Sequence, residues 1–218
     1  MKKFFAMILS CALFVTLAAC STSSEESTGP QTSEQSSQSS EDSSTAYSAS
    51  ESKPESEPGA NALVIYFSWS GNTETIAGEI ASQTGADTFQ LEPATAYSTD
   101  YNTVLDEAQA EQRADACPEI VGSIENFDSY DVIYLGFPNW WGDMPMILYS
   151  FLDDYDLSGK TIAPFVSSGG SGFSGALSAI ASAEPGATIT DGLSLSSSAS
   201  QTPGGAVADW LADIGFAE

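Results

Sequence analysis

The feature that most constrains the fold is an alternation, from residue 61 onward, of short apolar runs with stretches of helical spacing. The strand-like runs are at residues 63–67, 88–91, 132–137, 161–166 and 187–195. The helical patterns are at residues 73–82, 101–114, 146–152, 175–182 and 207–214. Continuous apolar runs are typical of parallel strands that are buried on both faces. The alternation therefore predicts a three-layer α/β/α sandwich around a five-stranded parallel sheet of order 2-1-3-4-5.

In open sheets of this kind, ligands bind beyond the carboxyl ends of the strands, where the strand order reverses. Three loops of unusual composition follow the strand ends at Phe67, Phe137 and Val166. We therefore expect the functional site to be built from these three loops.

The first loop has the composition of a phosphate cradle and consists of Ser68, Trp69, Ser70, Gly71, Asn72 and Thr73. Its hydroxyls can donate to phosphate oxygens, and Gly71 allows a tight turn. Thr73 opens a helix whose free N–H groups and dipole face the same point. The loop has no Lys or Arg, so backbone amides around Gly71–Thr73 would be the main ligands. The alternative is an ordinary capped turn between a strand and a helix.

The second loop has the composition of a wall for a flat aromatic ligand and consists of Pro138, Asn139, Trp140, Trp141 and Gly142. Such a ligand needs apolar planes around it, and two adjacent Trp side chains follow the strand directly. We expect at least one Trp to contact the ligand. The alternative is that one Trp belongs to the core while the other covers a helix.

The third loop spans residues 167–172, and its candidate binding residues are Ser168, Gly169, Gly170 and Gly172. Three residues without side chains allow the backbone to approach a ligand closely, so their amides can reach its polar edge. The alternative is a flexible connector.

In this order and at these strand ends, the three loops carry a family resemblance. The first resembles the phosphate loop of flavodoxins, and the other two resemble the Trp-Trp-Gly and Gly-rich loops of a bacterial flavodoxin-like family. The resemblance extends over nearly all of residues 63–214. It implies non-covalent binding of flavin mononucleotide (FMN), with the second loop at the isoalloxazine ring and the third at its pyrimidine end.

The resemblance leaves the activity open, because the family includes electron carriers and oxidoreductases. We expect electron transfer. The alternatives are an FMN-dependent NAD(P)H:quinone-type oxidoreductase and a non-redox binding module that lost the cofactor. Relatives often carry an Arg before a Pro-Glu pair, where this chain has Cys117 before Pro118. No catalytic side chain and no metal ligand is assigned.

The N-terminal residues 1–20 resemble a lipoprotein signal peptide. Lys2 and Lys3 precede an apolar run, which ends in a lipobox-like sequence at Cys20. The alternative is an ordinary cleaved signal with a chance Cys. Residues 21–60 have the composition of a disordered Ser/Glu-rich tether, and residues 61–218 form the predicted domain. We therefore expect an extracytoplasmic protein, lipid-anchored to the bacterial cell membrane through Cys20.

The composition is strongly acidic, with a net charge of -25, 5 Lys+Arg and no His. Nucleic acid is therefore a poor partner, and a Ser-His-Asp triad or an imidazole metal site is excluded. Of the 30 acidic residues 8 precede residue 61, which leaves 22 in the domain against two bases, Arg113 and Lys160. Lys160 follows Gly159 at a turn into the fourth strand and is expected at the surface. The acidic domain favours a basic redox partner, although acidity also serves solubility.

Three further features are weighed beside the loops. Cys117 lacks the neighbours that activate a thiol, so no function is assigned to it. The acidic run at 153–156 lacks the ligand spacing of a calcium site. Tyr97 and Tyr101, in the long connection after the second strand, could form a lid over the flavin.

Overall fold

The computed structural model describes residues 61–217, so the predictions for residues 1–20 and 21–60 lie outside the described residues. Its strands are β1 (Ala62–Tyr66), β2 (Asp87–Gln90), β3 (Val132–Pro138), β4 (Thr161–Ser168), β5 (Thr188–Ile189) and β6 (Leu193–Ser196). Its α-helices are α1 (Asn72–Thr84), α2 (Tyr101–Ala114), α3 (Met146–Asp154), α4 (Ala176–Ala183) and α5 (Gly204–Ile214), with short 3₁₀ helices η1 (Phe127–Ser129) and η2 (Ala199–Gln201). None of the described helices is long and apolar enough to span a bilayer.

The sheet has the order β2-β1-β3-β4-β5, and every pairing in it is parallel. This confirms the predicted α/β fold class and strand order. The carboxyl ends of β1, β3 and β4 lie side by side, since Tyr66 pairs with Gly136 and Gly136 pairs with Phe165. The three loops of interest therefore leave the same edge of the sheet.

The predicted fifth strand at residues 187–195 is interrupted. β5 pairs with the start of β4, and β6 pairs with its end. Gly192 lies between them against the Phe173 ring, so closely that a Cβ there would be 2.5 Å from a ring carbon. The neighbouring carbonyl of Asp191 accepts a hydrogen bond from Trp210 Nε1 at 2.9 Å. The N–H of Thr190 still bonds to the carbonyl of Ile162 in β4 at 3.0 Å, so the break between β5 and β6 falls at these contacts of Asp191 and Gly192.

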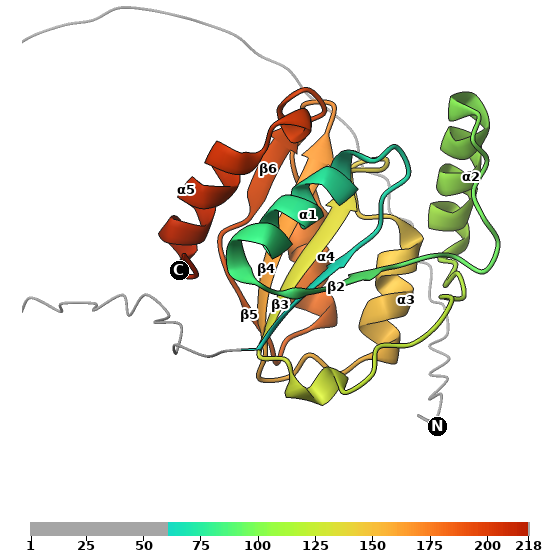
Figure 1. Cartoon of the computed structure of the whole chain (residues 1–218). Helices are drawn as coiled ribbons and strands as arrows, with labels where there is room; N and C mark the ends of the chain where they lie inside the picture. The colour runs from blue at the N-terminus through green and yellow to red at the C-terminus, as the bar shows by residue number, and fades with distance from the viewer. Residues whose placement is uncertain (1–60, 218) are drawn as a thin grey trace, which may run out of the picture. The chain divides into compact units, whose positions relative to one another are not determined.

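Two hydrophobic clusters cover the two faces of the sheet (Figure 1). Along β1, Leu63 and Ile65 belong to the cluster with α3 and α4, whereas Val64 and Tyr66 belong to the cluster with α1 and α5. This alternation follows from the two-residue period of a strand. Both clusters lie within residues 61–217, so this domain carries its own core.

Helix α2 contributes no residue to either cluster within the described part of the chain. Figure 1 shows it at one edge of the domain, away from α1 and α5. Its buried residues are Val104 and Ala108, and its N-cap Asp100 accepts the backbone N–H of Thr103. This helix is attached to the domain mainly through side-chain contacts near the loops.

The expectation that Lys160 lies at the surface is wrong. Its side chain is buried, and Nζ donates to the carbonyl oxygens of Tyr130 at 2.6 Å and Asp128 at 3.3 Å. Nζ also lies 5.1 Å from the centroid of the Phe127 ring. The physical reason is that carbonyls around η1 face inward at the start of β4 and need a donor. Arg113 is exposed, and its guanidinium donates to Gln109 Oε1.

Candidate functional site

A cavity of about 430 Å³ lies where the three predicted loops meet. Nine of the fifteen predicted binding residues line it: Trp69, Ser70, Asn72, Pro138, Asn139, Trp140, Trp141, Ser168 and Gly169. The remaining lining residues are Ser167, Ser197 and four residues of α2, namely Tyr101, Val104, Leu105 and Ala108. The loops thus form one concave site of the size usual for small ligands.

The first loop presents backbone donors at the start of α1. Gly71 is the N-cap and has a left-handed backbone with φ 85°. Ser68 Oγ accepts the N–H of Glu74 at 3.2 Å, and the N–H of Thr75 bonds to the carbonyl of Gly71. The N–H groups of residues 71–73 have no acceptor among the described residues. A 13-residue helix therefore offers three adjacent donors and its positive end at the rim of the cavity.

The hydroxyls of the first loop have protein partners. Thr73 Oγ1 and Ser167 Oγ lie 2.9 Å apart and are buried, so they join the first loop to the third. Ser70 Oγ accepts from Asn72 Nδ2 at 3.1 Å and keeps its own proton for donation. Gln201 Nε2 in turn donates to Asn72 Oδ1 at 2.7 Å. The loop is thus fixed in place by its side chains, and the backbone amides of residues 71–73 remain available as donors together with the hydroxyls of Ser68 and Ser70.

The second loop is a tight hairpin that displays Trp141. Trp140 and Asp143 flank its turn and exchange two backbone hydrogen bonds. The N–H of Trp140 donates to the carbonyl of Asp143 at 2.9 Å, and the N–H of Asp143 donates to the carbonyl of Trp140 at 3.1 Å. Between them, Trp141 and Gly142 both have positive φ, 54° and 81°, which is the pattern of a type I′ turn. A left-handed backbone is unusual for a bulky residue such as Trp. Its indole Nε1 donates to the carbonyl of Leu105 at 3.0 Å, and its side chain is 50% exposed.

The other two Trp side chains of the cavity are held more firmly. Trp140 packs edge-on against the rings of Phe67 and Tyr97, with centroid distances of 5.3 and 5.2 Å. Trp69 Nε1 donates to the carbonyl of Ser98 at 2.8 Å, and its ring lies 6.1 Å from that of Tyr101. The cavity wall therefore combines two anchored indoles with the half-exposed ring of Trp141.

Side chains organise the third loop and attach it to the second. Ser168 Oγ accepts the N–H groups of Gly170 and Gly172, at 3.2 and 3.1 Å. Asn139 Nδ2 donates to the carbonyl of Gly172 at 2.8 Å, and Asn139 Oδ1 accepts the N–H of Gly142 at 3.1 Å. Two of the amides that the sequence offered to a ligand are thus bonded within the protein. Among the three glycines of this loop, Gly169 lines the cavity.

Six predicted residues lie outside the cavity lining and shape the loops: Ser68, Gly71, Thr73, Gly142, Gly170 and Gly172. Sequence reasoning placed α2 correctly but did not assign it to the site. A signal for this role exists, because the lining residues of α2 at positions 101, 104, 105 and 108 have the spacing of one helix face. Tyr101, one of the two residues that could form a lid, lines the cavity and is 62% exposed.

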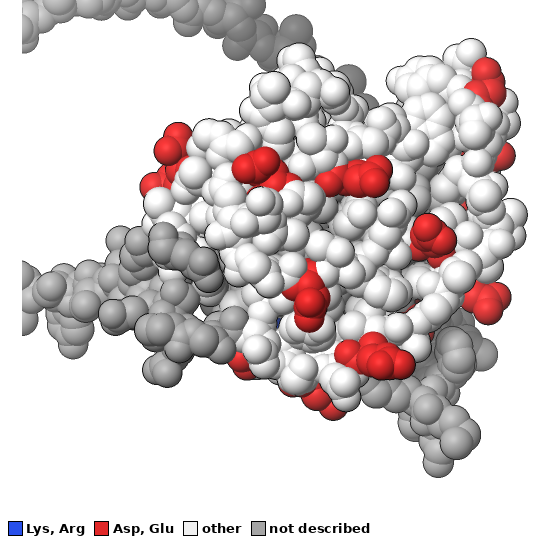
Figure 2. Space-filling view, viewed as in Figure 1, with Lys and Arg blue, Asp and Glu red and all other residues white. Residues whose placement is uncertain are grey.

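Acidic residues are abundant in the domain as a whole. Figure 2 shows Asp and Glu scattered over the visible face of the domain, with almost no Lys or Arg. The cavity's lining residues nevertheless include no Asp or Glu. The described residues also contain no cluster of potential ligands that could hold a metal ion. The site is therefore neutral, with backbone donors at one end and aromatic planes beside it.

Cys117 lies outside this cavity, is exposed and is a free thiol. Burial and the nearby carboxylates of Asp153 and Asp115 raise the pKa of this thiol, which disfavours the reactive thiolate.

A 2-1-3-4-5 parallel sheet, with a helix start and two further loops meeting at the point where the strand order reverses, defines a flavodoxin-like α/β protein. The sequence model of the flavodoxin family matches residues 61–214, and the chain belongs to this family. The family resemblance inferred from the three loops is thus confirmed.

Solved structures with the same fold include two Bacteroides proteins assigned as flavoproteins. The protein of Bacteroides eggerthii is 30% identical, with a TM-score of 0.64, over 71% of this chain and 98% of its own. That of Bacteroides uniformis is 28% identical, also with a TM-score of 0.64, over 71% and 99%. A flavoprotein of Lactobacillus acidophilus in complex with FMN is 21% identical, with a TM-score of 0.56, over 67% and 99%. A search among curated proteins gives no match.

Proposed function

We propose that this protein binds FMN non-covalently in the 430 Å³ cavity and acts in electron transfer. The observation that carries the proposal is the neutrality of the cavity in an acidic domain. None of the residues that line it is Asp or Glu, although the domain contains 22 acidic residues. Carboxylates would repel a phosphate, whereas the free amides of a helix start attract it. A cavity without acidic residues beside such a helix start therefore suits a phosphate-bearing ligand.

The residues present fit FMN. The amides of residues 71–73 and the hydroxyl of Ser70 would hold the phosphate. Trp69, Trp140 and Trp141 would contribute the aromatic planes that a flat ring needs, and the backbone of Gly169 lies at the third loop's side of the cavity. Membership in the flavodoxin family and the FMN complex of the Lactobacillus acidophilus protein support this choice of cofactor.

When bound, FMN accepts and donates electrons, and the protein's part is to bind the cofactor and set its surroundings. The free amides would hold the phosphate, and the indoles would contact the ring end of the cofactor. The apolar face of α2 excludes water from that end. No side chain is assigned the transfer of a proton. The acidic surface suits a basic redox partner, whose encounter it would accelerate.

The deciding experiment is a visible absorption spectrum of the purified domain, residues 61–218, before and after addition of FMN. We expect flavin absorption bands and quenched flavin fluorescence. A colourless protein that takes up no FMN after reconstitution would leave the non-redox binding module as the better description.

A second candidate is an FMN-dependent NAD(P)H:quinone-type oxidoreductase. It is favoured by the exposure of Tyr101 and Trp141 at the cavity, because the site is open enough for a second substrate. Steady-state oxidation of NADH or NADPH with a quinone as acceptor distinguishes the two. Turnover by the FMN-loaded domain supports the enzyme, and its absence supports the carrier.

We further propose that the chain is exported and lipid-anchored through Cys20 on the outer side of the bacterial cell membrane. The lipobox-like sequence supports this. Metabolic labelling with a fatty-acid analogue should modify the full-length chain but not its Cys20→Ser variant. Equal labelling of both would contradict the anchor.

A further inference from the structure

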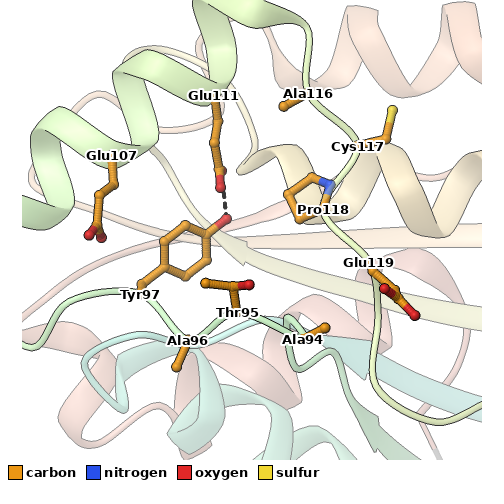
Figure 3. A pocket seen from close by; sticks show the side chains of 10 residues that line it. All are labelled: Ala94, Thr95, Ala96, Tyr97, Glu107, Glu111, Ala116, Cys117, Pro118 and Glu119. Atoms are coloured by element: carbon orange, nitrogen blue, oxygen red, sulfur yellow. Dashed lines mark hydrogen bonds between the residues drawn. The ribbon is translucent and has the colours of Figure 1, made fainter.

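Two glutamates of α2 hold the segment that precedes this helix. Glu111 Oε2 accepts the hydroxyl of Tyr97 at 2.7 Å, which Figure 3 shows as the dashed line. Glu107 Oε2 accepts the backbone N–H of Ser98 at 2.9 Å. Glu107 and Glu111 are four residues apart and therefore share one face of the helix. Two adjacent turns of α2 thus anchor two adjacent residues of the loop.

The anchored segment contacts two of the indoles that line the proposed flavin cavity. The ring of Tyr97 meets Trp140 edge-on, at 5.2 Å between centroids and 84° between planes. The carbonyl of Ser98 accepts Trp69 Nε1 at 2.8 Å. The residues 97–98 therefore lie between α2 and the aromatic wall, and a shift of this segment would move both indoles.

Few other contacts attach α2 to the domain. The helix contributes nothing to the two hydrophobic clusters of the described residues, and only Val104 and Ala108 of its residues are buried. Its remaining polar contact to the site is the bond from Trp141 Nε1 to the carbonyl of Leu105. Since α2 also supplies one wall of the cavity, its attachment sets the width of the cavity.

The carboxylates of Glu107 and Glu111 have no basic partner among the described residues. They line a second cavity of about 380 Å³, together with Tyr97, Cys117 and Glu119 (Figure 3). Neither carboxylate forms an ion pair with Arg113 or Lys160, whose partners are Gln109 and the carbonyls near η1. Burial is the largest cause of the raised pKa of Glu111; the hydrogen bond from Tyr97 opposes it, and the charge of Glu107 adds to it. The clearest contacts of the two glutamates are therefore their hydrogen bonds to Tyr97 and Ser98.

We propose that Glu107 and Glu111 are positioning residues of the flavin site. By anchoring Tyr97 and Ser98 they fix Trp140 and Trp69, and so set how tightly FMN is held. This inference rests on the proposed function, because it assigns roles within the same site.

The test compares Glu111→Ala, Tyr97→Phe, their double variant, and the conservative Glu111→Gln, all in the domain of residues 61–218. Glu111→Ala and Tyr97→Phe each remove the bond while keeping the Trp residues, and Glu111→Gln keeps an oxygen that can accept it. The matched control is Glu119→Ala, which removes a carboxylate from the same second cavity without touching Tyr97 or Ser98.

Two measurements are made: FMN affinity by fluorescence titration, and the near-UV circular dichroism of the FMN-free domain, which reports the surroundings of the Trp side chains. We expect Glu111→Ala, Tyr97→Phe and the double variant each to weaken FMN binding by about tenfold, the size of one lost charge-assisted hydrogen bond. Glu111→Gln and Glu119→Ala should stay within about threefold of the parent protein. The near-UV spectrum should change in the first three variants only.

Unchanged affinity and an unchanged near-UV spectrum in Glu111→Ala and Tyr97→Phe would overturn the proposal. So would a double variant whose loss is the product of the two single losses, because residues that act through one bond are not additive. If the parent protein binds no FMN, the proposed function fails. The near-UV spectra then still decide whether Glu111 positions the indoles.

Discussion

At the scale of single residues, Gly71 is the position where the proposed phosphate cradle can be tested most directly. Its backbone is left-handed, with φ 85°, and a Cβ there would meet no atom within 4 Å. Asn and Asp both tolerate this conformation, so either fits without a clash. A carboxylate beside the phosphate would repel it, whereas an amide of the same shape would not.

We therefore expect Gly71→Asp to weaken FMN binding at least tenfold relative to Gly71→Asn, since charges about 4 Å apart near a protein surface interact by several kcal/mol. Fluorescence titration of both variants measures the ratio, and circular dichroism checks that α1 is intact. Equal affinities would mean that the phosphate does not bind at this helix start.

Trp141 offers a test in which stability and binding should separate. Its left-handed backbone, with φ 54°, costs about 1–2 kcal/mol in a residue other than Gly. Trp141→Gly relieves this strain and loses an exposed hydrogen bond to Leu105, worth about 0.5–1.5 kcal/mol. We expect the unfolding free energy of the FMN-free domain to change by less than about 1 kcal/mol, because these two effects oppose each other. FMN affinity should nevertheless fall by about tenfold, because a contacting aromatic plane is lost. Urea unfolding and FMN titration of the same variant give both numbers.

The binding loops could be predicted from the sequence because their signals are local. Gly71, Trp141 and Gly169 follow strand ends directly, and the rule that ligands bind beyond the carboxyl ends of strands places all three loops together. The roles of Lys160 and Glu111 could not be predicted. Their partners, the carbonyl of Tyr130 and the hydroxyl of Tyr97, lie 30 and 14 residues away in the sequence and meet them only in the folded chain.

At the scale of elements, the polar amphipathic pattern of residues 101–114 predicts α2 with the bounds that the structure shows. Its function as a cavity wall was missed. Helical spacing shows that Val104, Leu105 and Ala108 share a face, but not whether that face covers the core or a ligand site. The break between β5 and β6 was missed for a similar reason, since it depends on the contact of Gly192 with Phe173.

Strands β3 and β4 approach each other closely at Gly136 and Phe165. Gly136 lies opposite Phe165, and a Cβ on Gly136 would be 2.1 Å from a ring carbon of this fully buried side chain. Gly136→Ala should therefore destabilise the domain by about 1–3 kcal/mol or more, the usual cost of overpacking a core. Gly78→Ala is the matched control, because Gly78 lies in α1 with no atom within 4 Å of an added Cβ. That variant should be stabilised by up to about 1 kcal/mol. Urea unfolding curves measure the unfolding free energy of both variants. Equal changes in Gly136→Ala and Gly78→Ala would contradict the close contact between Gly136 and Phe165.

The attachment of η1 to the start of β4 depends on the buried ammonium of Lys160. Lys160→Met keeps the side-chain stem and removes the charge, which leaves the carbonyl of Tyr130 without its donor. We expect a loss of about 1–3 kcal/mol in unfolding free energy. Arg113→Met removes the domain's other base from an exposed position and should change stability by no more than about 0.5 kcal/mol. A Lys160→Met variant as stable as Arg113→Met would show that these bonds contribute nothing.

At the scale of the whole molecule, the dominant quantity is the charge of the domain, 22 acidic residues against two bases. Like charges repel one another across the folded surface, and salt screens this repulsion. Two partly buried carboxyl groups act in the same direction. Burial is the largest cause of the raised pKa of Glu111 and of Glu184. The charge of Glu107 adds to the shift of Glu111, and the charge of Asp156 adds to that of Glu184. The folded state therefore binds protons more readily than the unfolded state does.

The sign of the pH dependence follows. A carboxyl group with a raised folded-state pKa contributes stability that is fully present below its ordinary value of 4.5 and is lost as the pH rises through the folded-state pKa. Asp100 acts in the opposite sense, because hydrogen bonds from Thr103 lower its pKa from 3.8. The stability that Asp100 contributes is lost only at a pH more acidic than the range from pH 7 to pH 5.

We expect Tm to rise from pH 7 to pH 5, and salt to raise Tm more at pH 7 than at pH 5. In Glu184→Gln the rise between pH 7 and pH 5 should be smaller, because one of the two groups no longer titrates. Thermal melts at low and high salt measure these shifts. A Tm that falls between pH 7 and pH 5 would show that favourable carboxylate contacts outweigh repulsion in this fold.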